Sequence, residues 1–305
     1  MKMKWRLSVI CAVLAAFVVL SASAVADPIN VLWYQGGTQT STSSTYQSDV
    51  NALASLAPSS PGSNTWSVTF WNSGAMPSGS YNVLVVASPE GGWSSYPDYS
   101  ALDSALSGVT FGNRLMLTGQ DADWHYMNFP GGAPGSNNPS NGFNGPEGFL
   151  LDSVNWAGSG TGLGLVALGV TGTGSCSSAP NYGLTGYSSD CTGTDNVQIP
   201  ASESSFPINT NLTSAGLSNW STSAHTDFYN LDTSLWNGIN LNGNGSCTPG
   251  AGCYVTIVSA STAGGGITHH AGGAVPEPAS VAMLAVGVLG LVGLEAYRKR
   301  KAFQA

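Results

Sequence analysis

Short apolar runs and segments with helical spacing alternate along the first half of the chain. Residues 29–34 (INVLWY), 83–86 (VLVV) and 115–118 (LMLT) are short, mostly apolar runs. Runs of this length are typical of strands that are covered on both faces. Residues 66–71 (WSVTFW) alternate apolar and polar positions, which predicts a strand with one exposed face.

Helices are predicted between these strands. Between residues 46 and 57 an apolar side chain recurs every three or four positions, which is one face of an amphipathic helix, and Pro58 ends it. A second helix with the same spacing runs through residues 99–106, and a third begins at Pro146, which suits the first position of a helix.

Two further strands are expected at residues 163–170 and 254–258. The order strand, helix, strand, strand, helix, strand is typical of an α/β fold with a mostly parallel sheet and right-handed crossovers. Residues 171–253 are poorly periodic, and we expect them to form an irregular region at one end of the sheet.

The first 26 residues have the pattern of a secretory signal peptide. Basic residues at positions 2, 4 and 6 precede an apolar stretch over residues 7–20, and the small residues Ala24 and Ala26 predict cleavage before Asp27. An uncleaved anchor is the alternative, but the apolar stretch is short for one. The pattern predicts export through the Sec machinery and an exported domain over residues 27–260.

The exported part is acidic and almost free of cations. Arg114 is its only Lys or Arg, whereas fourteen of the chain's sixteen Asp and Glu lie within it. One cation cannot neutralise a row of phosphates, so nucleic acid and anionic lipid headgroups are poor partners. Divalent cations and neutral glycans fit this surface better.

Four of the five cysteines lie in the exported part, which reaches an oxidising compartment. Four cysteines allow three pairings, and proximity favours Cys176 with Cys191 and Cys247 with Cys253. Zinc binding is the alternative, but the short paired spacings typical of zinc sites are absent.

The C-terminus carries the most specific motif. Residues 275–278 are Val275, Pro276, Glu277 and Pro278, an apolar helix is expected over 279–297, and a basic tail of Arg298, Lys299, Arg300 and Lys301 follows. Basic flanks are typical of the cytoplasmic end of a membrane helix. A Gly-rich tether, residues 261–274, joins this segment to the exported domain.

This C-terminal segment, residues 275–305, resembles a PEP-CTERM sorting signal, which is also catalogued as the ice-binding protein C-terminal domain. The resemblance implies recognition by exosortase, a membrane-bound cysteine enzyme of Gram-negative bacteria that cuts near the motif. It further implies that the chain is held in the inner membrane, with its domain in the periplasm, until it is processed and passed to the cell surface or the medium.

One dense polar cluster follows the strand at 115–118. If residues 121–125 are extended, Asp121, Asp123 and His125 point to one side as candidate ligands for a divalent cation. Ligands collect at the carboxyl ends of strands in open α/β sheets, which favours a site here. The alternative is a loop whose Asp side chains bind nearby backbone N–H groups.

The strand order and the glycine turn after residue 118 resemble the flavodoxin-like core of class I glutamine amidotransferase-like proteins. That family places a nucleophilic Cys on this turn, but the turn here is Gly119, Gln120 and Asp121. His225, with Asp227 two residues later, could supply a base and its orienting carboxylate. A structural role for His225 is the alternative.

We therefore expect a flavodoxin-like α/β domain that is not an enzyme and needs no cofactor, tethered to the membrane and associated with exopolysaccharide. The competing hypothesis is a secreted metal-assisted hydrolase that uses Asp121, Asp123, His125 and His225.

Overall fold

The parallel half of the sheet is built from five of the predicted strands. In the computed structural model these are β1 (Ile29–Tyr34), β2 (Trp66–Trp71), β3 (Val83–Val86), β4 (Phe111–Thr118) and β5 (Leu163–Ala167). All four residues of β3 are buried and β3 pairs with strands on both sides, so the prediction of a central parallel strand is confirmed. The structure describes residues 28–35, 44–59, 64–88, 100–127, 143–169, 182–218, 220, 222–244 and 253–260.

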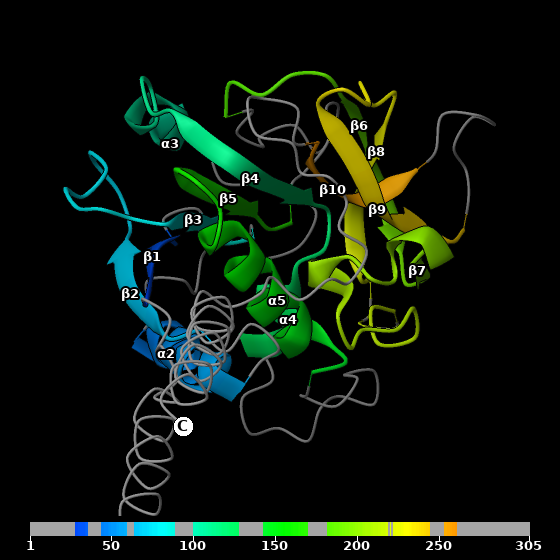
Figure 1. Ribbon diagram of the computed structural model, residues 1–305, viewed down its shortest axis with the longest axis horizontal. Helices are drawn as coiled ribbons and strands as arrows, with labels where there is room; N and C mark the ends of the chain where they lie inside the picture. Colours follow the sequence, from blue (N-terminus) through cyan, green and yellow to red (C-terminus); the bar gives the residue numbers. More distant parts are fainter. Residues whose placement is uncertain are drawn as a thin grey trace, which may run out of the picture. The chain divides into compact units, whose positions relative to one another are not determined.

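The five parallel strands lie in the order β2-β1-β3-β5-β4 (Figure 1). A flavodoxin-like sheet has the order 2-1-3-4-5. Here β5 lies between β3 and β4, so the finer flavodoxin-like prediction is wrong in strand order. Residue patterns identify the strands but do not say which strand lies beside which. The coarser prediction of a mixed α/β domain with a mostly parallel sheet and few helices is confirmed.

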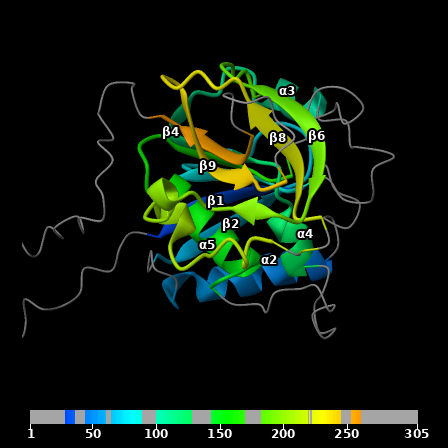
Figure 2. The same cartoon turned by 90° about the vertical axis from the view of Figure 1, so that its right-hand side faces the viewer.

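Helices cover both faces of the parallel half. Figure 2 shows α2 (Ser44–Leu56) and α5 (Pro146–Gly158) on one side of the sheet, and α4 (Ala122–Met127) lies with them. The opposite face carries α3 (Ser100–Ala105). The prediction that α5 begins at Pro146 is confirmed.

Each strand of the parallel half contributes side chains to two hydrophobic cores, one on each face of the sheet. Alternate residues of β1 point to opposite faces, so Val31 and Trp33 pack with the α2 and α5 side, whereas Leu32 and Tyr34 pack with Leu102 of α3. This two-sided burial explains why β3 and the last residues of β4 appear in the sequence as short, mostly apolar runs.

The second half of the sheet is antiparallel, and only its strand at residues 254–258 was predicted. It contains β6 (Ser188–Thr194), β7 (Val197–Gln198), β8 (Ala224–Tyr229), β9 (Trp236–Asn242) and β10 (Tyr254–Ser259). The expectation of an irregular region over 171–253 is therefore wrong where the structure describes it. β6 consists mostly of polar residues such as Ser, Asp and Thr, so its sequence lacks the hydrophobic pattern by which strands are predicted.

β10 joins the two halves, because it pairs with β4 of the parallel half and with β8 and β9 of the antiparallel half. Short 3₁₀ turns lie at Ala57–Ser59, after α2, and at Ala201–Glu203 and Pro207–Asn209, between β7 and β8.

Candidate functional site

The turn after β4 brings the two halves of the sheet into contact. The N–H of Gly119 donates to Val255 O at 2.8 Å, and the N–H of His225 donates to Gly119 O at 2.8 Å. A Cβ on residue 119 would lie 2.4 Å from Thr226 O and 2.6 Å from Thr226 N. Only glycine allows this approach, and it places the first residues of β8 directly against the turn.

Asp121 lies between two histidines. Its Oδ2 is 3.1 Å from Nε2 of His225 on β8, and its Oδ1 is 3.2 Å from Nε2 of His125, one turn further along α4. The His125 contact is electrostatic, because no aligned hydrogen bond joins these two atoms. The side chains of Asp121 and His125 are 11% and 6% exposed, so the carboxylate is shielded from water on the His125 side.

The charges of Asp121 and His225 stabilise each other. Burial disfavours the ionised form of Asp121, but attraction to His225 and His125 outweighs it, so the pKa of Asp121 lies well below its usual range. Burial likewise opposes protonation of His225, but attraction to Asp121, and more weakly to Asp195, raises the pKa of His225. Asp121 is therefore ionised at neutral pH, and it favours the protonated form of His225.

Asp123 does not join this trio, which corrects the expected metal site. The segment is helical from Ala122 rather than extended, so Asp121 and Asp123 do not share a side. Oδ2 of Asp123 instead accepts hydrogen bonds from the Tyr46 hydroxyl at 3.1 Å and the Ser88 N–H at 2.9 Å. Burial raises the pKa of Asp123, and these hydrogen bonds only partly offset it.

The described parts of the chain contain no group of three or more His, Cys, Asp or Glu residues arranged to hold a metal ion. The geometry that the structure does provide is an acid–base pair, since a carboxylate beside an imidazole stabilises the imidazolium. A covalent route would also need a nucleophile. The turn position of the amidotransferase-like nucleophile is occupied by Gln120, whose amide is within hydrogen-bonding distance of Leu217 O and Thr256 Oγ1.

Asp227 is not the carboxylate that faces Nε2 of His225, because Asp121 takes that place. The two oxygens of Asp227 accept hydrogen bonds from the Asn242 side chain at 3.2 and 2.9 Å. The prediction that His225 belongs to the site has the support of its contact with Asp121. The prediction of Asp227 as its orienting group stays a prediction. Residues two apart on a strand share a face, but a residue from another strand can come closer.

Sequence reasoning missed the aromatic residues that contact Asp123 and His125. Tyr46 was interpreted as a core position of α2, yet its hydroxyl accepts a hydrogen bond from Trp33 Nε1 at 3.1 Å and donates one to Asp123. The ring of Trp220 lies 5.6 Å from the ring of His125. The hydroxyl of Tyr46 on an otherwise apolar helical face was the one available signal, since a buried hydroxyl needs a partner.

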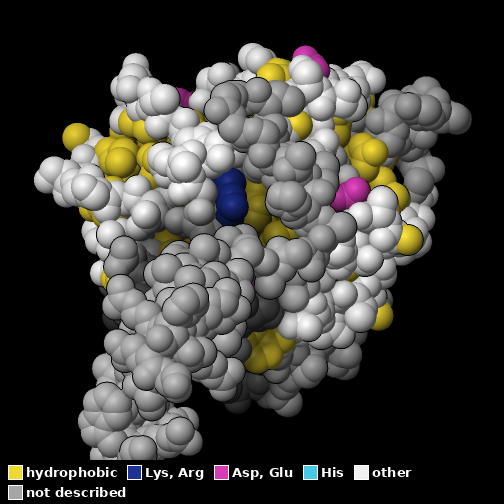
Figure 3. Space-filling model, viewed as in Figure 1, with side chains coloured by type: hydrophobic (Ala, Val, Ile, Leu, Met, Phe, Trp, Pro, Cys, Tyr) yellow, Lys and Arg dark blue, Asp and Glu magenta, His cyan; other side chains and the backbone are white. Residues whose placement is uncertain are grey.

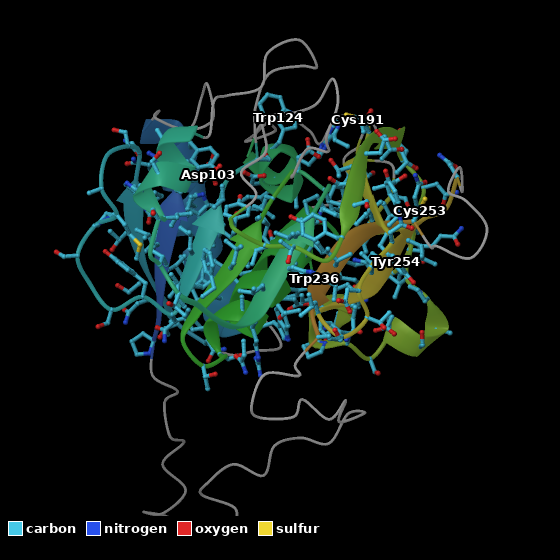
Figure 4. All side chains as sticks on the ribbon, turned by 90° about the horizontal axis from the view of Figure 1, so that it is seen from above. Asp103, Trp124, Cys191, Trp236, Cys253 and Tyr254 are labelled. Atoms are coloured by element: carbon cyan, nitrogen blue, oxygen red, sulfur yellow. The ribbon has the colours of Figure 1, made fainter. Side chains whose placement is uncertain are left out.

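Cys191 and Cys253 are both disulfide-bonded. They lie at separate places on the antiparallel half in Figure 4. Cys176 and Cys247 lie outside the described residues, so the pairing stays a prediction. The signal peptide, the tether, the sorting motif, the C-terminal helix and the basic tail also lie outside the described residues.

The surface of the described part is poor in charge. The space-filling view is dominated by uncharged polar and hydrophobic groups (Figure 3). Arg114 is the only Lys or Arg among the described residues, and its guanidinium donates to Trp156 O at 2.8 Å and to Ser159 Oγ at 2.5 Å, at the end of α5. This cation therefore serves to cap a helix C-terminus.

Residues 274–300 match the model of the PEP-CTERM protein-sorting motif. The motif implies an exosortase-sorted, membrane-anchored protein of the cell surface. No curated protein and no solved structure matches the chain, so the resemblance to amidotransferase-like proteins has no support from a relative. Among the described residues, no helix is long and apolar enough to cross a membrane.

Proposed function

We propose that the α/β domain is a non-catalytic, exopolysaccharide-associated module that exosortase delivers to the cell surface. The match to the sorting motif at residues 274–300 is the observation that carries the proposal, because it defines where the domain acts. Export begins with the signal peptide, and the helix over 279–297 holds the chain in the inner membrane until exosortase cuts near Pro276, Glu277 and Pro278.

The surface chemistry of the domain supports a neutral glycan partner. With Arg114 already engaged at the end of α5, the described surface offers no free cation to an anionic polymer. Uncharged hydroxyl and amide groups remain available for hydrogen bonds. The engagement of Gln120 at the turn supports a binding role over covalent catalysis.

Sorting and matrix association can be tested separately in a host that has exosortase. Deleting the exosortase should leave a full-length, membrane-bound precursor, and Glu277→Gln should do the same if the carboxylate is recognised. Replacing Arg298, Lys299, Arg300 and Lys301 with Gln should weaken retention of the C-terminal helix, because these charges define its cytoplasmic end. A tag at the C-terminus that stays protected from external protease in the quadruple variant would contradict that role.

For matrix association, the wild-type chain should remain with the exopolysaccharide fraction and pass into the medium in a strain that makes none. Equal release from both strains would overturn the association and leave the sorting intact.

A metal-assisted hydrolase is the second candidate. The contact of Asp121 with His225 favours it as an acid–base pair, but the described residues contain no group of three or more side chains arranged to hold the metal. Elemental analysis of the purified chain distinguishes the two. A stoichiometric divalent metal that is lost in His225→Gln would favour the hydrolase, whereas metal-free protein that retains exopolysaccharide association would favour the binding module.

A further inference from the structure

A groove lies beside β7, at the far side of the antiparallel half. It has a volume of about 440 Å³ and runs between residues 195–199 and the turn at 214–218. Its polar lining consists of Asp195, Asn196, Gln198, Ser214 and Ser218. This volume is in the range of small-molecule sites, which is roughly 300–1,000 Å³.

Hydrogen bonds hold the two walls of the groove together. The hydroxyl of Ser218 accepts the N–H of Val197 at 2.9 Å and donates to Ser214 O at 2.6 Å. The hydroxyl of Ser214 accepts the N–H of Ile199 at 3.0 Å. The groove is therefore preformed, and a ligand need not order it, which lowers the entropic cost of binding.

Two exposed side chains of the lining have hydrogen-bonding capacity for a ligand. Asp195 accepts the N–H groups of Thr222 and Ser223 at Oδ1, which fixes the carboxylate and leaves Oδ2 as an acceptor among the described contacts. The amide nitrogen of Gln198 lies 3.5 Å from Asn196 Oδ1, at the long limit of a hydrogen bond. Most of the capacity of this amide remains for a ligand.

The remaining lining residues are Val197, whose side chain is buried, and the more exposed Ile199 and Ala215. The lining itself contains no Lys or Arg, although Asp195 also attracts His225. A carboxylate without a nearby Lys or Arg repels anions and accepts hydrogen bonds from hydroxyls. Amide groups both donate and accept, and small aliphatic side chains pack against the C–H face of a sugar ring. This combination fits a neutral, hydroxyl-rich ring better than a phosphate, a uronic acid or a lipid.

We propose that this groove binds a neutral pyranose unit of a polysaccharide. The inference deepens the proposed function and rests on it for the source of the glycan. The hydroxyls of the sugar donate to Asp195 and exchange hydrogen bonds with Gln198, while its ring packs on Ile199 and Ala215.

The test uses the full-length chain in a zwitterionic detergent, because the headgroup of a sugar detergent would compete for the groove. Calorimetric titrations use neutral gluco-, galacto- and manno-oligosaccharides, with an oligouronate and an extended neutral peptide as comparisons. We expect binding of at least one neutral oligosaccharide, and no binding of the oligouronate.

Two variants report on the groove. Ala215→Phe fills it and should weaken binding roughly tenfold or more, and Gln198→Ala should weaken it about fivefold, as expected for the loss of one or two hydrogen bonds. The matched controls are Ala52→Phe and Asn51→Ala, at exposed positions of α2, which should bind like the wild type. Thermal unfolding of each variant checks that the domain is folded.

Wild-type chain that binds no neutral oligosaccharide, or that binds the peptide or the oligouronate instead, overturns the proposal. Sugar binding that Ala215→Phe and Gln198→Ala leave unchanged overturns it as well. Retention in the matrix with no effect of the groove variants would refute the groove and leave the proposed function standing. Sugar binding in vitro without retention in the matrix would refute the association with exopolysaccharide and leave the groove as a sugar site.

Discussion

The central strands of the parallel half and the strand β6 of the antiparallel half differ in how many of their residues are buried. In the parallel half, β1 and β3 are buried on both faces and consist almost entirely of apolar residues. In the antiparallel half, β6 has only two buried residues out of seven, and its register with β8 is interrupted between Cys191 and Thr194. Hydrophobic packing holds the interior of both halves, since β8 and β10 are also mostly buried, whereas the polar strand β6 depends more on hydrogen bonds and covalent links.

The candidate site lies where the halves meet. Asp121 and His125 follow β4, which is the parallel strand next to the antiparallel half, whereas His225 belongs to β8 of the antiparallel half. Thr118 of β4 and Thr256 of β10 add a buried hydroxyl contact of 2.9 Å across the same boundary. Variants at the boundary should therefore affect both halves, and variants within one half should not disturb the other.

Gly119→Ala should have the largest effect, because the new Cβ meets the backbone of Thr226 and forces the halves apart. We expect the free energy of unfolding to fall by about 3 kcal/mol, at the upper end of overpacking costs. Chemical denaturation measures it. Gly108→Ala is the control, since its φ of +84° strains an alanine but no atom lies within 4 Å. Equal losses in the two variants would show that the close approach does not matter.

Reduction of the disulfides should weaken the antiparallel half selectively. A loop of 15 residues, as predicted for Cys176 and Cys191, contributes about 3 kcal/mol in the chain-entropy model. Hydrogen exchange with and without reductant should show loss of protection in β6 and β8 but little change in β1 and β3. Peptide mapping without reduction should find the links 176–191 and 247–253, and a link between 176 and 253 would contradict the predicted pairing.

Asp152→Asn tests the parallel half, where burial on α5 raises the pKa of Asp152 to about 8. The folded state keeps this proton up to about pH 8, whereas the unfolded chain releases it near pH 3.9, so stability falls as pH rises between these values. The amide removes the cost of burying a charge. We expect Asp152→Asn to be more stable than the wild type by about 2 kcal/mol at pH 9 and by little at pH 4. Unchanged stability at pH 9 would argue against a buried, neutral carboxyl.

Asp121→Asn should lower the free energy of unfolding by about 2 kcal/mol at pH 6, because it removes the charge that both histidines face. The loss stays below that for a fully buried pair because the side chain of His225 is 20% exposed and can release its proton. Asp227→Asn is the comparison within the antiparallel half. Burial raises the pKa of Asp227, so Asp227→Asn should lower the free energy of unfolding less than Asp121→Asn does. A larger loss of unfolding free energy in Asp227→Asn than in Asp121→Asn would contradict this prediction.

His225→Gln should have the smallest effect, of about 1 kcal/mol, and only at pH values below the raised folded pKa of His225. The pKa of His225 is raised in the folded state, so its stabilisation is complete below about pH 6.5 and is lost as pH rises through the folded value. The lowered pKa of Asp121 acts at the acidic end of the pH range. Its contribution to the stability of the folded state is lost as pH falls below about 3.9. The melting temperature of the wild type should therefore peak at mildly acidic pH, and His225→Gln should flatten the decline above pH 6.5.

The site was partly predictable. The run at 115–118 followed by Asp121 placed polar groups at the carboxyl end of a strand, and the structure brings His125 and His225 to that carboxylate. The orientation of Asp123 was not predictable, because the same residues support either an extended segment or a helical turn. Which form occurs depends on the packing of α4 against α5 and α2, far apart in the sequence.

The amino-acid sequence by itself determined the elements of the parallel half and the sorting motif, because both are local patterns. Apolar runs show that a strand is buried, and the motif at 275–278 is contiguous with the apolar stretch and the basic tail that follow it. Only the tertiary structure decided that β5 inserts between β3 and β4, that polar segments after residue 182 extend the sheet, and that His225 faces Asp121 across 104 positions of chain. Strand pairing satisfies backbone groups whatever the side chains are, so hydrophobic periodicity carries little information about which strands and which polar residues meet.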